Sequence, residues 1–313
     1  MTVTFGILAI LLIMLAVLLA LTAGLLALSV VLSFTVAWYE RVNNDPTLDE
    51  RRRPALAIWL ILSEFVCLLA TLLLRPFGWL PARIPAGPSR RTPVILLHGL
   101  FQNRSCLLPL QWRLRAAGYD RIICVNTPPW HDLERLNDIV ATTVAAVRRT
   151  SGSGKVHLVG HSMGGILAHC YLQFRDGAPD VTTCITIGTP YHGSKLAPFA
   201  ISRLGRGLLP GSVLLARLNA EPLPGGVHFT SIYSRHDNII VPMDSARLNG
   251  ANNLELTGLG HTAMLFSAQV AEAVVAALQS GDAGLGTGGT KFQPHQTSPP
   301  SNQQRSYDDH LHH

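Results

Sequence analysis

The chain has 313 residues, of which 48% are hydrophobic and only 14% are charged, and its formal net charge is +6. This length is enough for one large domain with a substantial core plus appendages, and the charged fraction is low for a soluble protein. The basic residues form no stripe with interleaved aromatic residues, which argues against nucleic acid, and many arginines lie beside apolar segments, an arrangement that suits anionic lipid headgroups.

The N-terminal segment contains no charged residue from Val3 to Trp38 and is rich in leucine, isoleucine, valine and alanine. It exceeds the roughly 20 apolar residues that cross a bilayer, and it predicts a transmembrane helix over about 4–38. A cleaved signal peptide is the competing interpretation. The segment lacks the basic start of a signal peptide and is longer than an ordinary signal-peptide core.

A second apolar run, residues 54–74, is interrupted only by Glu64 and is flanked by arginines at 51–53 and 75. It predicts a second spanning helix, so that residues 1–80 form a hairpin anchor. A carboxyl group within hydrocarbon is a functional-site candidate, and we favour the simpler alternative of a protonated or paired carboxyl that faces the first helix. Similar arginine clusters flank both sides of the hairpin, so the positive-inside rule does not choose an orientation.

Prolines and arginines fill residues 81–92, which we interpret as a linker. From residue 93 short apolar runs alternate with amphipathic ones. The expected strands cover 94–99, 121–125, 156–160, 181–188, 228–234 and 253–258, and the expected helices cover 105–117, 132–149, 164–174 and 261–278. Continuous apolar strands that alternate with helices indicate a mostly parallel sheet buried on both faces, so residues 93–279 are predicted to form an α/β domain.

Two segments depart from this pattern. Residues 190–226 are apolar but show the pattern of neither a clean strand nor a long helix. Two interpretations fit them equally well: a lid or cap over a site, or a helical excursion packed on the sheet edge. Residues 280–313 are rich in Gly, Ser, Pro, Gln and His and predict a disordered tail. We interpret its histidines as part of a solvated tail rather than as metal ligands: His295, His310, His312 and His313.

The cysteines show no paired short spacing, and the default interpretation is that they are small buried hydrophobic residues. They are Cys67, Cys106, Cys124, Cys170 and Cys184. Neither a metal site nor an oxidising compartment is predicted from them.

Residues 156–165, VHLVGHSMGG, predict a buried strand that turns sharply into a helix with Ser162 at the bend. The pentapeptide 160–164 is G-x-S-x-G, in which a serine on a strained turn needs neighbours without side chains at the flanking positions. The helix that follows directs its N-terminus at the site, which favours negative charge developing there. A chance match in a glycine-rich chain is the alternative, and the strand before the motif and the apolar helix after it favour chemistry.

A serine hydroxyl needs a base to take its proton and an acid to orient that base. When the serine precedes both partners, as in the α/β-hydrolase order, the acid and then the histidine follow on loops after later strands. Asp237 follows the expected strand 228–234, and His261 follows the expected strand at 253–258. Asp244 and His236 are the nearby competitors and rank below this pair.

The oxyanion formed by serine attack needs preorganised donors, usually backbone N–H groups. We expect one from Met163, directly after the serine, and the other from Leu100, because Gly99 allows the chain to turn inward after the strand at 94–99. His98 is expected to be a structural histidine rather than a base.

Together these residues resemble the bacterial lipase and esterase branch of the α/β-hydrolases. Residues 230–241 (TSIYSRHDNIIV), 246–261 and 264–270 (MLFSAQV) are similar to the end of the class 2 small lipases typified by the lidless Bacillus enzyme, and 188–194 (GTPYHGS) resembles an element of bacterial lipases. The resemblance implies the α/β-hydrolase fold. It also implies the catalytic roles of Ser162, Asp237 and His261 and the oxyanion roles of Leu100 and Met163.

The resemblance covers about residues 92–278 and has three departures. They are the two apolar N-terminal helices, the longer apolar segment after Ser194, and Gly160 where the Bacillus enzymes carry alanine. A secreted soluble lipase with a wide-open site is therefore not expected. Members of this family sometimes hold a structural calcium, but no carboxylate cluster here predicts one.

The sequence thus predicts a membrane-anchored serine hydrolase that cleaves carboxylic esters of lipid or acyl type, a lipase or esterase, through an acyl-enzyme and without a cofactor or metal. An acyltransferase with the same triad is the first alternative. A catalytically inactive membrane-bound interaction protein is the alternative from another class. The expected location is the bacterial inner (cytoplasmic) membrane, with a multi-pass topology and with the oligomeric state and the side of the catalytic domain left open.

Overall fold

The computed structural model describes residues 2–44, 54–81 and 84–286. Its centre is a sheet of six strands in the order β2-β1-β3-β4-β5-β6, and every neighbouring pair is parallel. The strands are β1 (Val94–Leu97), β2 (Ile122–Val125), β3 (Val156–His161), β4 (Val181–Ile187), β5 (His228–Ser234) and β6 (Asn252–Leu256). The predicted α/β fold with a parallel sheet is confirmed.

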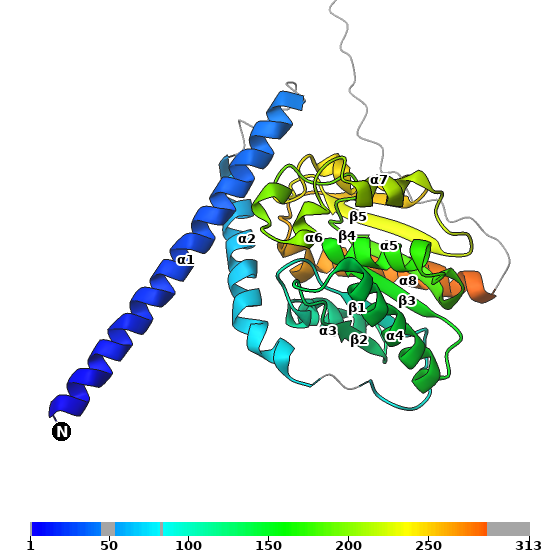
Figure 1. Cartoon of the computed structure of the whole chain (residues 1–313), viewed down its shortest axis with the longest axis horizontal. Coiled ribbons are helices and arrows are strands. Elements are labelled where there is room, and N and C mark those ends of the chain that lie inside the picture. Colours follow the sequence, from blue (N-terminus) through cyan, green and yellow to red (C-terminus); the bar gives the residue numbers. More distant parts are fainter. Residues whose placement is uncertain (1, 45–53, 82–83, 287–313) are drawn as a thin grey trace, which may run out of the picture.

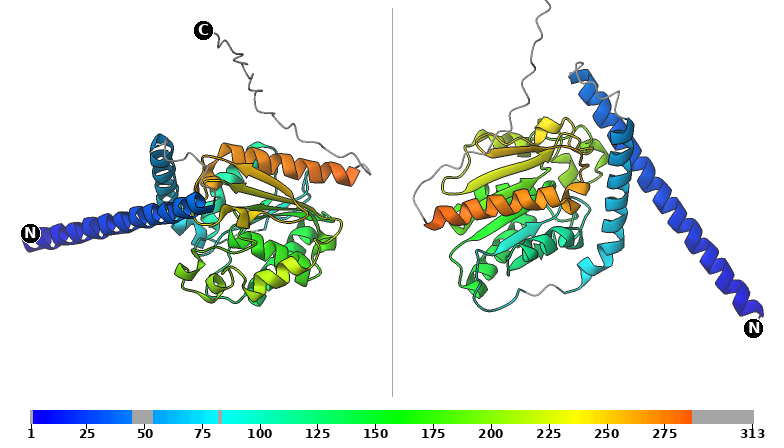
Figure 2. Two further views of the ribbon diagram at one scale, coloured as in Figure 1. Left: turned by 90° about the horizontal axis from the view of Figure 1, so that it is seen from above. Right: turned by 180° about the vertical axis from the view of Figure 1, so that it is seen from behind.

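Helices cover both faces of this sheet (Figures 1 and 2). On one face lie α4 (Leu133–Ser151) and α5 (Met163–Phe174), and on the other lie α3 (Leu108–Ala116) and α8 (Ala268–Gly286). Successive side chains of a strand point to opposite faces, so in β1 Ile95 and Leu97 join the core under α4 and α5, while Val94 and Leu96 join the core under α3 and α8. This two-sided burial explains why β1 and β2 are apolar at every position.

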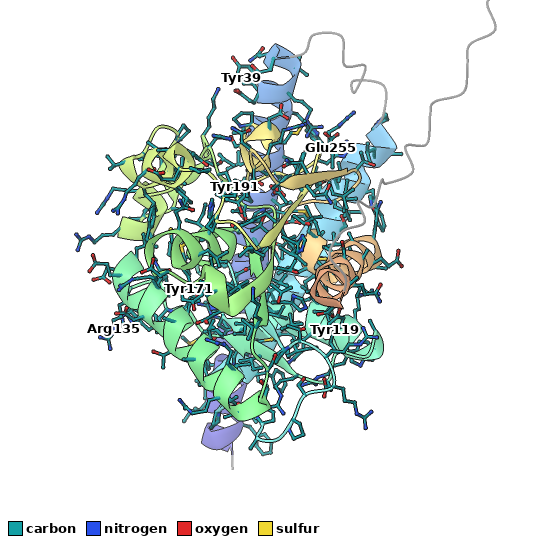
Figure 3. All side chains as sticks on the ribbon, turned by 90° about the vertical axis from the view of Figure 1, so that its right-hand side faces the viewer. Tyr39, Tyr119, Arg135, Tyr171, Tyr191 and Glu255 are labelled. Atoms are coloured by element: carbon teal, nitrogen blue, oxygen red, sulfur yellow. The ribbon has the colours of Figure 1, made fainter. Side chains whose placement is uncertain are left out.

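The structure of α4 follows from local signals in its sequence. The Asp132 side chain accepts a hydrogen bond from the Arg135 backbone N–H, which caps the first turn, and Gly152 ends the helix in the left-handed conformation with φ 67°. Arg135 lies on the outer surface in Figure 3, and Tyr191, labelled in the same view, is fully buried.

The segment 190–226 forms a 3₁₀ turn (Ala197–Phe199) and two short helices, α6 (Arg203–Arg206) and α7 (Val213–Ala220). Leu204, Leu215 and Leu218 are buried in the core beside α5, whereas Ile201 and Val213 are almost fully exposed. The segment is therefore attached to the domain through one apolar side.

The last helix differs from the prediction at both ends. The expected helix over 261–278 begins only at Ala268, because residues 263–266 form a 3₁₀ turn, and it continues to Gly286. Residues 280–286, which were expected in a disordered tail, are therefore helical. Gly281 allows α8 to lie close to β4, because a Cβ at this position would collide with the Thr183 side chain. The predicted tail beyond 286, with its four histidines, lies outside the described residues.

The two N-terminal apolar segments are both helical and are both long and apolar enough to be candidate membrane spans. Helix α1 (Thr2–Asn44) projects away from the domain over its N-terminal half, as Figure 1 shows, while α2 (Pro54–Leu74) runs along the domain. The two helices meet through Val30, Phe34 and Leu60, which are buried between them. After α2, a 3₁₀ turn at Arg75–Trp79 is fastened to the domain, because Asn103 and Asn126 donate hydrogen bonds to its carbonyl groups.

We expect the Asp282→Asn variant to be about 1 kcal/mol less stable than the parent at neutral pH. The Asp282 carboxylate accepts hydrogen bonds from Thr92 and His157 at 2.7 and 3.0 Å. Burial by itself raises the pKa of Asp282, but these bonds outweigh burial and hold the pKa below its usual value. A depressed pKa means that this stabilisation is present at neutral pH and is lost as the pH falls through that pKa.

Urea unfolding of the detergent-solubilised protein measures this difference at several pH values. The matched control is Glu272→Gln, which makes the same change at an exposed position on the same helix. A deficit in the Asp282→Asn variant that stays constant down to strongly acidic pH would contradict the assignment.

Candidate active site

Ser162 lies at a sharp turn between β3 and α5. Its backbone has φ 55° and ψ −123°, outside the conformations that side-chain-bearing residues favour, and its N–H donates to Ile187 O at 2.8 Å. Cβ atoms at three flanking positions would collide with the chain: at Gly160 with the backbone of 164 and 165, at Gly164 with the Leu97 carbonyl, and at Gly165 with Thr189. In this chain the turn is thus packed so closely that a Cβ at any of the three positions would require neighbouring atoms to move.

Asp237 and His261, two of the predicted site residues, are in direct contact. His261 Nδ1 lies 2.8 Å from Asp237 Oδ2, and both side chains are buried. The other carboxylate oxygen, Oδ1, accepts hydrogen bonds from the backbone N–H groups of Ile239 and Ile240 at 2.8 and 2.9 Å. The carboxylate is therefore fixed before any substrate arrives, and it orients the imidazole so that Nε2 is the nitrogen left to act as a base.

The competing acid and histidine do not occupy this position. Asp244 lies on the 3₁₀ turn Met243–Ala246 and is exposed. His236 is buried next to Asp237, but its Nδ1 accepts a hydrogen bond from the Gly258 N–H at 2.9 Å. The ranking from the sequence agrees with this geometry.

Ser162 and His261 both line a cavity of about 350 Å³. In the described part of the chain, their side chains are not hydrogen-bonded to each other, and bonds of this kind often tighten only when substrate binds. Most of the cavity wall is apolar. The N-terminal helices and the segment 190–226 supply part of it: Leu26 of α1, Leu68 and Leu72 of α2, and Leu196, Ala197, Ala200 and Leu208. The segment 190–226 is thus both packed on the core and part of the cavity wall.

The loop after β1 reaches the same cavity. Leu100 lines it, and a Cβ at Gly99 would lie 3.0 Å from the Cβ of Ser162, so the backbone passes very close to the serine. Met163 is the first residue of α5, so its N–H belongs to the free N-terminal turn of that helix. The two backbone groups predicted as oxyanion donors therefore belong to segments that flank Ser162.

His98 is held in the structure by hydrogen bonds at both ring nitrogens. Its Nε2 accepts from the Thr127 N–H at 3.0 Å, so Nδ1 is the nitrogen that donates to Gly99 O at 2.8 Å. Burial lowers the pKa of His98 to about 4, although the bond to Gly99 works in the other direction. His98 is a neutral ring that shapes the loop, in agreement with the prediction of a structural role.

Opposing effects act on the protonation of His261. Burial disfavours the charged ring, but the charge and hydrogen bond of Asp237, together with the charge of Glu64, outweigh burial and raise the pKa of His261 above its usual value. The neighbouring ring of His161, 4.6 Å away between centroids, has its pKa lowered well below the usual value by burial and then by His261. His161 is therefore neutral, and one imidazole of the pair is poised to accept a proton.

Two residues that the sequence did not place in the site contact the segment around His261: Glu64 of α2 and Asn238, which follows β5. The expectation that Glu64 faces the first helix is wrong: its carboxylate accepts hydrogen bonds from the backbone of Thr262 and Ala263, beside His261. Asn238 was not singled out at all. Its Oδ1 accepts from the His261 N–H and its Nδ2 donates to Ser33 of α1. The lone acidic residue in an apolar run was a signal for Glu64, and nothing in the sequence pointed to Asn238.

Comparison with known proteins agrees with this fold. The model of the Alpha/beta hydrolase family matches residues 94–231. A triacylglycerol lipase of Pseudomonas fragi is 28% identical over 127 residues, which are 39% of this chain and 41% of that lipase, so the chain spans less than half of that relative's length.

Two solved lipases share the fold. The structure of the Bacillus licheniformis lipase BlEst2 in mature form has a TM-score of 0.55 at 19% identity and covers 63% of this chain and 96% of its own. Aspergillus fumigatus lipase B has a TM-score of 0.56 at 21% identity, over 64% of this chain and 55% of its own. At these identities the likeness concerns the fold.

We expect Gly160→Ala to destabilise the protein by about 1–3 kcal/mol, because its new Cβ meets backbone atoms of 164 and 165 that no side-chain movement relieves. Thermal unfolding in detergent measures the effect. Gly154→Ala, just before β3 and with no atom within 4 Å of the new Cβ, is the matched control and should leave the melting temperature nearly unchanged. Equal melting temperatures for the two variants would mean that the close packing of the turn is not needed for stability.

Proposed function

We propose that this chain, which has the α/β-hydrolase fold and resembles a lipase over part of its length, is a membrane-anchored serine hydrolase that cleaves carboxylic esters of lipid or acyl type. One observation carries the proposal. Ser162, on its strained turn, lines the same cavity as His261, and His261 is bonded through Nδ1 to the buried carboxylate of Asp237. This is the arrangement of nucleophile, base and orienting acid that ester hydrolysis requires.

In the proposed cycle the Ser162 Oγ attacks the ester carbonyl carbon while its proton passes to His261 Nε2. The backbone N–H groups of Leu100 and Met163 stabilise the oxyanion, and collapse of the intermediate expels the alcohol, which takes the proton from His261. Water then attacks the acyl-enzyme with His261 as base, which releases the acid and restores the serine. Asp237 stabilises the imidazolium at each stage, and the cycle needs no cofactor.

The cavity supports an acyl or lipid ester as substrate. Its walls are mostly apolar, with leucines from several segments, and Ser162 and His261 line the same space, so an apolar chain can be buried while its ester group meets the serine. Leucines from α1 and α2 form part of the wall, so a substrate resident in a membrane has an apolar path to the serine.

For the membrane anchor, α1 is the better-supported span. The most apolar 18-residue stretch of α1 contains no buried residue, and from Ile7 to Leu28 the helix rises about 33 Å, close to the thickness of the hydrocarbon layer. The second half of α1 is occupied by contacts with α2 and the domain, including the Lys195–Glu40 ion pair.

The sequence predicted that α2 is a second span, and its contacts favour another position. Glu64, in the middle of α2, is bonded to residues 262 and 263 of the domain, so lipid cannot surround the helix at that level. Its outer face remains apolar and exposed through Ile58, Leu62 and Val66. We therefore propose that α1 crosses the membrane and that α2 holds the domain against it, with this outer face toward lipid, in place of the predicted multi-pass hairpin.

We expect Ser162→Ala to abolish both labelling by a fluorophosphonate probe and hydrolysis of p-nitrophenyl esters, a loss of at least about 10³-fold in rate, because the Ser162 Oγ is the atom proposed to form the acyl-enzyme. The matched control is Ser194→Ala in the same cavity, whose hydroxyl is already committed to hydrogen bonds with residues 239 and 241. This variant should still be labelled. Failure of the parent protein to react, or equal labelling of the Ser162→Ala variant, would refute the enzyme proposal.

We expect the parent protein to stay in the membranes during alkaline carbonate extraction. We expect a variant that lacks residues 2–28 to be released from the membranes by the same treatment. Only α1 is proposed to cross the bilayer, while α2 stays bonded to the domain. The fractions are read by immunoblot, and detergent solubility of any pelleted material separates membrane insertion from aggregation. A deleted protein that still resists carbonate yet dissolves in detergent would support the two-span hairpin instead.

A further inference from the structure

A carboxylate from an apolar helix reaches the loop that carries His261. Glu64 Oε1 accepts from the Thr262 N–H at 2.8 Å and Oε2 accepts from the Ala263 N–H at 2.9 Å, so both oxygens are engaged by consecutive backbone groups. The Glu64 side chain is only 1% exposed, and Thr262 and Ala263 are also buried. This is a bidentate contact between segments separated by nearly 200 residues of sequence.

The neighbouring glycine makes room for this contact. A Cβ at Gly260 would lie 2.9 Å from the Glu64 carboxyl carbon and 3.1 Å from Asn238 Oδ1, so the chain before His261 runs close to both groups. Position 260 therefore accepts only glycine while Glu64 stays where it is. The backbone on both sides of His261 is shaped around that carboxylate.

A second bond chain connects α1 to the same histidine. Ser33 Oγ accepts from Asn238 Nδ2 at 2.8 Å, and Asn238 Oδ1 in turn accepts from the His261 backbone N–H at 2.9 Å. Three consecutive backbone N–H groups, those of 261, 262 and 263, are thus taken up by Asn238 and Glu64. Backbone groups held in this way have little freedom to move, so the ring of His261 is fixed relative to α1 and α2.

From these contacts we infer that Glu64 is a positioning residue for His261: its carboxylate holds the 261–263 backbone and adds negative charge beside the imidazole. The inference rests on the proposed function, since it gives α2 a part in the reaction through the base. It makes the apolar helix a component of the catalytic site as well as an attachment to the membrane.

Several titratable groups face His261, and their charges determine the direction of the pH effect. The loop after β5 presents the Asp237 carboxylate, α2 presents Glu64, and the end of β3 presents His161, whose ring is neutral. Burial raises the pKa of Glu64, and the hydrogen bonds from the Ala263 and Thr262 N–H groups oppose that shift; in the pH range where Glu64 is ionised, both carboxylates favour the imidazolium. Removing the charge at Glu64 should therefore lower the pKa of His261, so the neutral base persists to lower pH and the acidic limb of the rate profile moves to lower pH.

The test is the pH profile of kcat/KM for p-nitrophenyl ester hydrolysis by the full chain in detergent, for the parent, Glu64→Gln and Glu64→Asp. We expect Glu64→Gln to lose about 10- to 100-fold in kcat with a smaller change in KM, because the base is misplaced. Its acidic limb should move to lower pH. Glu64→Asp keeps the charge but is one methylene shorter, so we expect a loss of kcat with an acidic limb closer to that of the parent.

The matched control is Glu40→Gln, the same amide change on α1, where the carboxylate pairs with Lys195 and does not touch the 261–263 backbone. It should leave kcat and the acidic limb unchanged. Thermal unfolding of each variant reports separately whether it folds. If Glu64→Gln does not fold, the kcat of Glu64→Asp is compared with the kcat of the control Glu40→Gln.

The outcomes separate the two proposals. If the parent neither hydrolyses esters nor reacts with fluorophosphonate, the proposed function is wrong. Two results with an active parent would overturn the inference. In the first, Glu64→Gln has the same kcat and the same acidic limb of the pH profile as the parent. In the second, its activity falls only in proportion to the fraction of protein that is folded and its acidic limb does not move, so Glu64 has only a structural role.

Discussion

The close contact between β3 and α5 is the constraint on which the site depends. Ser162 has φ 55° at the end of a buried strand, and the strand, the helix and the β1 carbonyls can approach one another there because Gly160, Gly164 and Gly165 have no side chains. Once this turn forms, the serine hydroxyl is carried to the carboxyl edge of the parallel sheet. The loops after β1, β5 and β6 meet at the same edge, which is why residues distant in sequence converge there.

The electrostatics of the site follow from burial combined with backbone hydrogen bonds. Asp237 and Glu64 are both almost fully buried, and each has its oxygens taken up by backbone N–H groups or by His261, so neither carboxyl group is left without partners. Between them stands His261, whose protonated form is favoured by both. His161 beside it is neutral, so the site has one imidazole whose protonation is adjusted by its surroundings.

The N-terminal helices change the character of the fold. Helices α1 and α2 supply part of the cavity wall. Ser33 of α1 accepts a hydrogen bond from Asn238, and Glu64 of α2 accepts one from Thr262, so both helices are bonded to the segments around His261. The 3₁₀ turn after α2 is fastened to the domain as well. The proposed membrane attachment and the assembly of the site are therefore coupled, since displacing α2 from the domain would open the cavity and release the 261–263 backbone together.

The sequence alone determined the order of strands and helices along the chain, the parallel sheet and the apolar nature of the two N-terminal helices. It also determined the candidate residues Ser162, Asp237 and His261. These follow from local patterns: hydrophobic periodicity, glycines around the turn, and polar residues just after strands. Only the tertiary structure decided where Glu64 points, that Asn238 holds His261, and that α8 continues through Gly281. Each of these depends on a partner more than 20 residues away, and such contacts leave no periodic trace in the sequence because they are set by how separate elements pack.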